Sequence, residues 1–481
     1  MKKLKYKNIS ILLLIILIST LLRFSLLAYN NTQHNGNPAE GQDWQARHSL
    51  AAAVSDFEFA PSHPIFHSGY DVSPEASKLV VTHGEPGLSY IHWIIKTISG
   101  TTSFNHLIIL HIILDALCLY IIYFMARTLG LSQKAQYFVA LFYAFNIGHI
   151  SLILMPTYNV WLTFYFICIS GLLLKFLSLE INSKYRNHLY LYIALTLVTI
   201  GASIIRSPSL YYPIFIGLCI ITLMIVRPSK YKFNEYKKLT LTLIAAGIST
   251  NLALSSMNYA IRGDFSATRS TVGHTFWAGV SQRENKYGIK NGDAGAVAFY
   301  TQLTGKKNYE AGMGIEYNQV LKDKAKEYIL ENPIDYISDV LNRSFHLFIP
   351  NQYILLNTYN STTNTLTDID KISGQYGKTS PRFWKEVTNK YWWYPMWISL
   401  RLLLIGFLAV SFISIFIFRK AHFETLIVLG PIFYGASVIS LIYMKGVIVS
   451  SVWTASLPAV LMGSCALYSF IKQKVKFLHS P

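Results

Sequence analysis

The sequence predicts an all-α polytopic membrane protein with about ten transmembrane helices and two long loops on one side of the membrane. Of its 481 residues, 52% are hydrophobic and only 14% are charged, and the mean hydropathy is +0.34. Apolar runs long enough to cross a bilayer recur along the chain. They lie at about 9–29, 107–126, 136–155, 158–178, 188–205, 209–226, 239–258, 398–418, 424–443 and 449–471.

Basic residues are distributed as this topology requires. Lys2, Lys3, Lys5 and Lys7 precede the first apolar run and place the amino terminus in the cytoplasm. Counted from there, every inside connection is basic, and an even number of spans returns the carboxyl terminus to the same side. Many of the charges behind the formal +18 therefore lie where they meet anionic lipid, so nucleic acid is not an expected partner.

The first apolar run is predicted to remain as an anchor helix. It exceeds the usual hydrophobic region of a secretory signal and continues without a clear small-x-small cleavage site. A cleaved signal peptide is the alternative interpretation. The composition, rich in Lys, Ile and Asn, suggests a bacterium, so we expect an integral protein of the bacterial inner membrane with both long loops outside.

The predicted spans divide the chain into three parts. Residues 1–258 form an N-terminal membrane module, which includes the first outer loop at about 30–106. Residues 259–397 form a large outer loop region, and residues 398–481 contain the C-terminal membrane helices. All four cysteines fall inside predicted spans, so the loops have no disulfide framework and redox chemistry is not expected.

Both outer loops are predicted to contain helices. In the first loop, Trp44 to Phe57 and Gly87 to Ile98 place apolar residues at helical spacing beside polar ones, as is typical of helices in the membrane interface. In the second loop, Tyr317 to Leu330 predicts an amphipathic helix. The pair Asn332-Pro333 ends it, and Asp335 to Phe348 begins another helix.

Several short motifs follow one another along the loops and helix ends. They are Asp43 before Gln45-Ala46-Arg47, Glu85-Pro86-Gly87-Leu88, Arg206-Ser207-Pro208, Arg262-Gly263-Asp264-Phe265, Gly273-His274-Thr275-Phe276, and the segment from Ala325 to Pro333 with Arg343 beyond it. In this order and spacing the motifs resemble the GT-C superfamily of polyprenyl-phosphate-sugar-dependent glycosyltransferases, specifically the protein O-mannosyltransferase and aminoarabinose-transferase-like branch.

Two positions depart from that branch. The fourth span of many relatives opens with a glutamate, whereas this chain has Asn159. The Arg-Tyr pair often found before the last helix is replaced by residues 450–454, Ser-Ser-Val-Trp-Thr. These departures bear on the details of donor or acceptor recognition more than on the fold.

The resemblance implies a GT-C-like fold and a membrane glycosyltransferase. Its donor would be a polyprenyl-phosphate-linked sugar, and its acceptor a glycan, lipid or protein on the outer face of the membrane. The departing phosphate has a second pKa of about 6, so the reaction needs no general acid. It does need a base for the acceptor hydroxyl and cations for the phosphate, which suits base-assisted direct displacement.

Two carboxylates of the first loop are the predicted catalytic residues. Asp43 is the candidate base, because partial desolvation at the bilayer surface raises the pKa of a carboxyl group toward a useful value. As the first residue of a helical run, Asp43 is equally suited to be an N-cap. Glu85, in a Gly-Glu-Pro-Gly turn, either orients the acceptor or is a solvated turn residue. His83 and His274 are the candidate acceptor-orienting or substrate-orienting residues.

Three cations on the outer side are the predicted donor-phosphate ligands. Arg206 lies at the outer end of the fifth span, where Pro208 fixes the following turn, and its planar guanidinium suits a phosphate. An arginine that extends to the lipid headgroups is the alternative. Arg262 at the end of the seventh span and Lys445 in the last outer connection are predicted to share the role.

No cofactor is predicted. His63 and His67 have helical spacing, but the prolines around them disfavour a helix and no acidic cluster accompanies them. A divalent metal ion shared by Asp43 and Glu85 is the alternative. Inside the second span, His111 and Asp115 are expected to make interhelical hydrogen bonds.

Two other classes of protein share this location. A transporter or flippase for lipid-linked sugars would concentrate its polar and helix-breaking residues near the middle of the membrane and show related halves. Here the polar residues concentrate in the outer loops. A polymerase or ligase of lipid-linked glycans would rely on loop arginines more than on Asp43.

Overall fold

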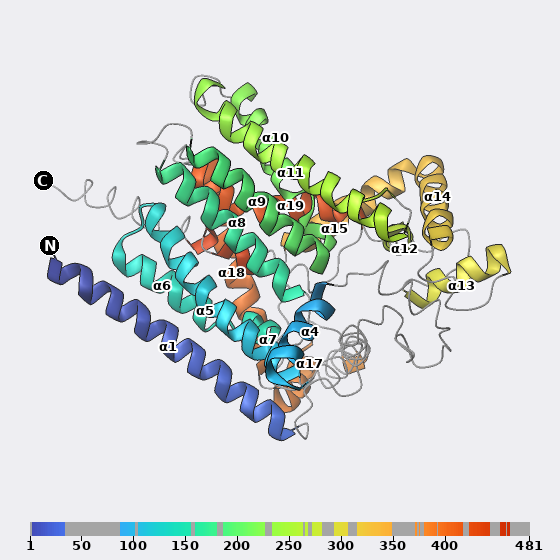
Figure 1. The fold of residues 1–481 in the computed structure, drawn as a ribbon. Coiled ribbons are helices and arrows are strands. Elements are labelled where there is room, and N and C mark those ends of the chain that lie inside the picture. The colour runs from blue at the N-terminus through green and yellow to red at the C-terminus, as the bar shows by residue number, and fades with distance from the viewer. Residues whose placement is uncertain are drawn as a thin grey trace, which may run out of the picture.

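The computed structural model describes most of the helical part of the chain. The described residues are 2–33, 87–101, 104–154, 159–179, 186–226, 233–262, 265–267, 272–280, 293–305, 315–348, 371–372, 375, 380–391, 393–416, 423–442, 453–457 and 459–461. Figure 1 shows a bundle of long helices with a group of shorter helices at one end.

Six of the described helices are long and apolar enough to cross a membrane, so the chain is an integral membrane protein. They confirm a continuous helix at the first, second and fourth to seventh expected spans. The apolar stretches are Ser10–Tyr29, Asn105–Thr128, Val160–Leu177, His188–Ile205, Ser207–Val226 and Tyr236–Ala260. The corresponding helices are α1 (Lys2–Gln33), α5 (Phe104–Thr128), α8 (Asn159–Leu179), α9 (Arg186–Ile205), α10 (Tyr212–Val226) and α11 (Phe233–Arg262), and the stretch of α10 also includes a short 3-10 turn before it.

The bundle is arranged largely in chain order. The first helix, α1, lies along one edge and packs on α5, which contacts α8 in turn, as Figure 1 shows. Then α8 packs on α9, α9 on α11, and α11 on α10 at the opposite edge. Buried aliphatic and aromatic side chains from these helices form one continuous core.

The third expected span, 136–155, is not one continuous helix. It is divided into α6 (Gln133–Ala144) and α7 (Ile147–Ile153). At the break, the side chain of Asn146 accepts a hydrogen bond from the backbone N–H of His149 and so begins α7 as its N-cap. Mean hydropathy over the run does not reveal the break, because the few polar residues, Asn146 among them, are averaged with many apolar ones.

The described helices of the two expected loops are α4 (Gly87–Ser99) from the first, and α12 (Val272–Val280), α13 (Asp293–Thr304), α14 (Ile315–Glu331), α15 (Pro333–Phe348) and α17 (Pro381–Lys390) from the second. Helices α12, α13 and α14 share a second core, called here the outer-loop core, and Tyr336 of α15 packs against it. Trp277 stacks on Phe299, with ring centroids 4.2 Å apart, and joins α12 to α13. Tyr300 and Tyr317 extend this core to α14.

Close packing of α12 on α14 depends on one glycine. A Cβ atom at Gly273 would lie 2.0 Å from the backbone oxygen of Asn318, so no other residue fits there without movement of the backbone. The boundary between α14 and α15 agrees with the sequence, since α14 ends at Glu331 and Pro333 is the first residue of α15.

The C-terminal part is described in shorter pieces. They are α18 (Trp393–Phe416), α19 (Phe423–Tyr434), a π-helical segment η2 (Gly435–Ile439) and α20 (Ser440–Ile442). Within them, Leu402–Ser411 and Ile427–Ile439 are apolar helices shorter than a full span. Much of the tenth expected span, 449–471, lies outside the described residues, so the full count of ten stays a prediction.

Candidate functional site

The candidate site is the corner at the C-terminal end of α9, where Arg206 lies. Helix α9 ends at Ile205, and Arg206 adopts an extended backbone (φ −153°, ψ 107°) that turns the chain out of the helix. A single 3-10 turn, η1 (Ser207–Ser209), follows, and Pro208 restricts its backbone. The side chain of Arg206 is only 7% exposed.

Three helices hold this turn through buried hydrogen bonds. From α8, the hydroxyl of Tyr165 donates to the backbone oxygen of Ser209 (3.0 Å). From α19, the hydroxyl of Tyr434 donates to the backbone oxygen of Pro208 (2.6 Å). The Ser209 hydroxyl donates back to the oxygen of Arg206 (2.9 Å) and pairs with Ser203 of α9 (2.9 Å). The backbone from which the guanidinium projects is therefore fixed.

The start of α4 packs against the same corner. A Cβ atom at Gly87 would lie 2.6 Å from Cγ1 of Ile205 and 2.9 Å from backbone atoms of Ile204 and Ile205. Only a glycine permits this approach without movement of one helix. The last residue of the Glu85-Pro86-Gly87 motif is thus in contact with the residue that precedes Arg206, although the two motifs are more than a hundred positions apart in the chain.

The other predicted site residues are less fully placed. Asp43, His83, Glu85 and Lys445 lie outside the described residues. Arg262 is the last residue of α11, and its side chain also lies outside the description.

His274 lies in α12, within the outer-loop core. Its Nδ1 is 2.6 Å from the hydroxyl of Tyr317 in α14. The structure therefore brings the Arg206 corner and the start of α4 together, and it shows His274 as part of the packing between α12 and α14.

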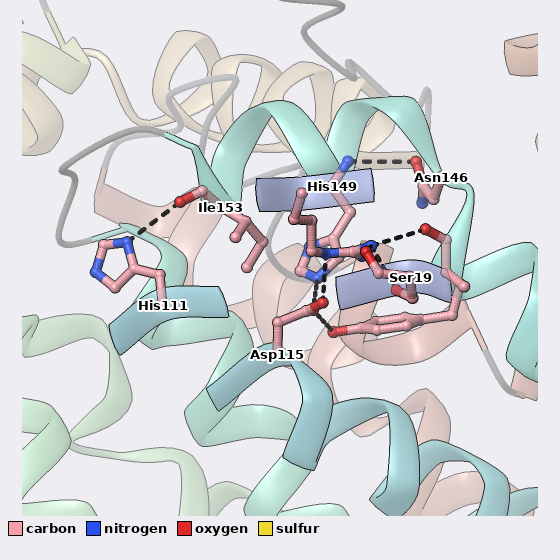
Figure 2. A network of polar contacts seen from close by, with 9 residues as sticks. Ser19, His111, Asp115, Asn146, His149 and Ile153 are labelled. Carbon is pink, nitrogen blue, oxygen red and sulfur yellow. Dashed lines mark hydrogen bonds and ion pairs between the residues drawn. The ribbon is translucent and has the colours of Figure 1, made fainter. Parts of the chain in front are cut away.

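A second polar cluster lies inside the bundle, among α1, α5, α6 and α7 (Figure 2). Arg23 of α1 and Asp115 of α5 form an ion pair, with 2.6 Å between Nε and Oδ2. The other carboxylate oxygen, Oδ1, accepts a hydrogen bond from the hydroxyl of Tyr143 (2.6 Å). It is also 2.6 Å from Nε2 of His149, so that nitrogen carries the proton. None of the four side chains is more than 1% exposed.

This cluster also contacts the end of α6, at its break from α7. Nη1 of Arg23 donates to the backbone oxygen of Ala144, the last residue of α6 (3.0 Å), and to Ser19 in its own helix. The charge of Arg23 is thus compensated by one carboxylate, by the carbonyl group of Ala144 at the break and by that of Ser19 in α1. The buried cluster links four helices, α1, α5, α6 and α7.

His111, one turn before Asp115, joins a separate pair of contacts. Trp161 Nε1 of α8 donates to its Nε2 (3.1 Å), so Nδ1 carries the proton toward the backbone oxygen of Ile153 (3.3 Å). The interhelical hydrogen bonds expected for His111 and Asp115 are confirmed. The partners Arg23, Tyr143 and His149 were missed, although an arginine inside the first apolar run and an aspartate inside the second are complementary charges that a pairwise search would have matched.

Comparison with known proteins gives distant structural similarity alone. No protein-family model and no curated protein matches the sequence. Among solved structures, the chain is similar to the archaeal oligosaccharyltransferase AglB from Archaeoglobus fulgidus in complex with an inhibitory peptide and a dolichol-phosphate, with a TM-score of 0.48 and 13% identity over 98% of this chain. An apo oligosaccharyltransferase from Archaeoglobus fulgidus gives 0.47 and 14% over 96%.

The chain spans about half the length of these solved structures, 51% of the first and 52% of the second. The function is therefore argued from the residues of this chain.

Proposed function

We propose that this protein is an integral membrane glycosyltransferase of GT-C type, which transfers a sugar from a polyprenyl-phosphate-linked donor to an acceptor on the outer face of the membrane. The observation that carries the proposal is the buried Arg206 on a fixed turn at the outer end of α9, beside the start of α4. We take the membrane to be a bacterial inner membrane, so the acceptor is periplasmic or extracellular.

Arg206 has the properties of a phosphate ligand. An arginine that extends to lipid headgroups leaves its guanidinium in water, whereas Arg206 is only 7% exposed. A guanidinium in such surroundings is stabilised by anionic or carbonyl oxygens, and its planar fork matches a phosphate. The hydrogen bonds around η1 hold its backbone, so little reorganisation is needed as negative charge collects on the departing phosphate.

The proposed reaction is a direct displacement. The acceptor hydroxyl oxygen forms a bond to the anomeric carbon while the bond from that carbon to the phosphate oxygen breaks. The hydroxyl proton passes to Asp43, and the bonding electron pair stays on the phosphate, which Arg206, Arg262 and Lys445 neutralise. In this proposal Glu85 and His83 orient the acceptor. His274 remains a substrate-orienting candidate, because Tyr317 holds its ring.

Transport of a lipid-linked glycan is the second candidate, because the break between α6 and α7 interrupts a helix inside the bundle. Transporters use such breaks to bind substrate groups. Here, however, the polar groups at the break bind one another and are shielded from solvent. The break therefore favours a structural role over a substrate site.

The deciding experiment uses the purified full-length protein in lipid nanodiscs with a radiolabelled polyprenyl-phosphate sugar. Appearance of label on an acceptor glycan or peptide, or slow release of free sugar, supports the transferase. Stable binding of the donor without turnover, together with movement of the donor between leaflets in vesicles, would support transport instead. Loss of turnover in the Asp43→Asn protein, with unchanged donor binding, would further separate a transferase from a contaminating activity.

A further inference from the structure

Helix α15 exposes several large apolar residues and buries two charged ones. Ile334, Ile337 and Leu341 are 79%, 56% and 64% exposed, whereas Asp339 and Arg343 are 5% and 4% exposed. This is the reverse of the arrangement expected for an amphipathic helix on the surface of a water-soluble domain. No described residue covers the apolar face formed by these three side chains.

The buried face of α15 is fixed to backbone oxygens of neighbouring helices. Arg343 Nε donates to the oxygen of Ser440 (2.7 Å), and its Nη1 donates to the oxygen of Gly279 at the end of α12 (2.9 Å). Ser344 donates to the oxygen of Ala436 (2.7 Å), and the Tyr336 hydroxyl to that of Leu441 (2.7 Å). One side of α15 is therefore attached to η2 and α20, the last turns of the membrane helix that begins with α19.

The remaining circumference of α15 has two distinct parts. Successive residues of an α-helix are about 100° apart, so Ile334, Ile337 and Leu341 fall on one stripe. Exposed Asp335 and Asn342 fall along the neighbouring edge, between that stripe and the buried face. A helix with protein, apolar and polar faces side by side matches a helix in the membrane interface, where lipid chains and water lie on adjacent sides.

The position of α15 along the bundle agrees with this environment. The helix formed by α19, η2 and α20 runs outward in the predicted topology, so Ser440 and Leu441, near the C-terminal end of its described part, are expected near the outer surface. Tyr336, which reaches Leu441, is a residue type enriched at that level. Figure 1 shows α15 at the end of the bundle where α12 lies.

We propose that α15 lies in the outer membrane interface and binds lipid acyl chains through Ile334, Ile337 and Leu341. Leu330, 81% exposed in the last turn of α14, continues the same lipid contact. The contact ties the outer-loop core to the bilayer surface, and the hydrogen bonds of Arg343 and Ser344 hold that core to the membrane helices. The inference is independent of the reaction that the protein catalyses.

The test places an environment-sensitive fluorescent amino acid at position 341 or 342 by nonsense-codon suppression, which leaves the native cysteines unchanged. The full-length protein is reconstituted in phosphatidylcholine vesicles. Quenching of the fluorescence is compared for aqueous iodide, for a lipid with a doxyl group near the headgroup, and for a lipid with a doxyl group at the chain terminus. Leu117, 52% exposed in the middle of α5, is the reference position for a spanning helix.

At position 341 we expect strong quenching by the doxyl group near the headgroup and little quenching by iodide. The adjacent position 342 should show the opposite preference, and Leu117 should respond most to the doxyl group at the chain terminus. Iodide quenching at both 341 and 342 would overturn the proposal, because the helix would then lie in water. Absence of quenching by every reagent at 341 would overturn it too, because protein would then cover the face. Position 337 repeats the measurement if the variant at 341 does not fold.

Discussion

Arg23 and Asp115 interact in a setting where neither charge can reach water. Removal of one partner leaves the other charge buried, which costs about 3–5 kcal/mol, whereas replacement of both by apolar residues is often neutral. We therefore expect Arg23→Met and Asp115→Leu each to lower the unfolding free energy by roughly this amount. The double variant should be considerably more stable than the sum of the two losses predicts.

Thermal or denaturant unfolding of the four proteins in detergent measures this coupling as a double-mutant cycle. Arg127→Ala, at an exposed position in the last turn of α5, is the control for loss of an arginine alone and should be close to neutral. Additive losses in the double variant would mean that the ion pair does not couple α1 to α5.

Arg206 gives a prediction about the donor. Loss of a phosphate ligand in Arg206→Ala should raise the KM for the polyprenyl-phosphate sugar and lower kcat, because the same contact holds the phosphate as it departs. Arg206→Lys should restore activity only in part, since an ammonium group lacks the planar fork. Steady-state kinetics on variants with unchanged thermal transitions provide the measurement, and unaltered donor kinetics in Arg206→Ala would remove the phosphate role.

Asp43 gives the prediction that separates a base from a helix cap. Asp43→Asn keeps the shape and any capping bond but cannot accept a proton, so turnover should fall by roughly 10²–10⁴-fold while donor binding persists. If Asp43 is only a cap, Asp43→Asn should be nearly silent and Asp43→Ala should cost about 1 kcal/mol of stability. Transfer assays and thermal unfolding on the same preparations distinguish these outcomes.

At the level of single residues, candidate site residues were easier to predict from the sequence than the residues that they contact. Arg206 is a candidate because an arginine at the end of a predicted span must face protein, water or phosphate, and the structure adds that Tyr165 and Tyr434 hold its turn. No periodicity could have indicated those tyrosines, since each is one aromatic among many in an apolar run. Partners of buried polar groups depend on how helices pack, which a single sequence does not specify.

Among the elements, the contact between α4 and α9 depends on the absence of a side chain at Gly87. Gly87→Ala would place a methyl group within 2.9 Å of the backbone of Ile204 and Ile205. We expect α4 to move away from the Arg206 corner, with lower stability and a higher KM for the donor. Gly201→Ala in α9 is the matched control, because a Cβ atom there meets no other atom within 4 Å.

The control substitution should be neutral or stabilising by about 0.5–1 kcal/mol, since alanine favours helix. Thermal unfolding and donor kinetics of the two variants provide the measurement. Equal behaviour of Gly87→Ala and Gly201→Ala would show that α4 does not need its close approach to α9.

Element boundaries were predictable where the sequence marks them with residues of special backbone behaviour. Asn332-Pro333 separates α14 from α15 as expected, because proline suits the first turn of a helix and not its interior. The break between α6 and α7 was not predicted. Asn146 can begin a helix only when the chain before it leaves the helical path, and packing of Arg23 on Ala144 stabilises that departure.

For the whole molecule, the topology itself is testable. A reporter fused after Lys290 should lie outside the membrane, and one fused after Ser229 should lie inside. Alkaline phosphatase and a fluorescent protein that fails to fold outside give opposite signals at the two positions. The reverse result at either position would remove the basis for placing Arg206 and Asp43 on the same side.

The overall class was predictable because it depends on sums over many residues. Hydropathy over about twenty positions identifies a span regardless of which helix it packs against, and six expected spans are confirmed as continuous helices. The arrangement of the outer-loop core depends instead on single contacts, such as the 2.0 Å approach that requires Gly273. Such contacts join residues far apart in the chain and leave no local pattern.

The bond from Arg23 to Ala144 also has a consequence for biogenesis. The two residues are 121 positions apart, so synthesis of the intervening chain takes on the order of ten seconds at typical translation rates. During that interval α1 carries an arginine whose partners in α5 and α6, Asp115 and the carbonyl group of Ala144, have not yet been made. We therefore expect the insertion machinery to retain α1 until α5 and α6 emerge.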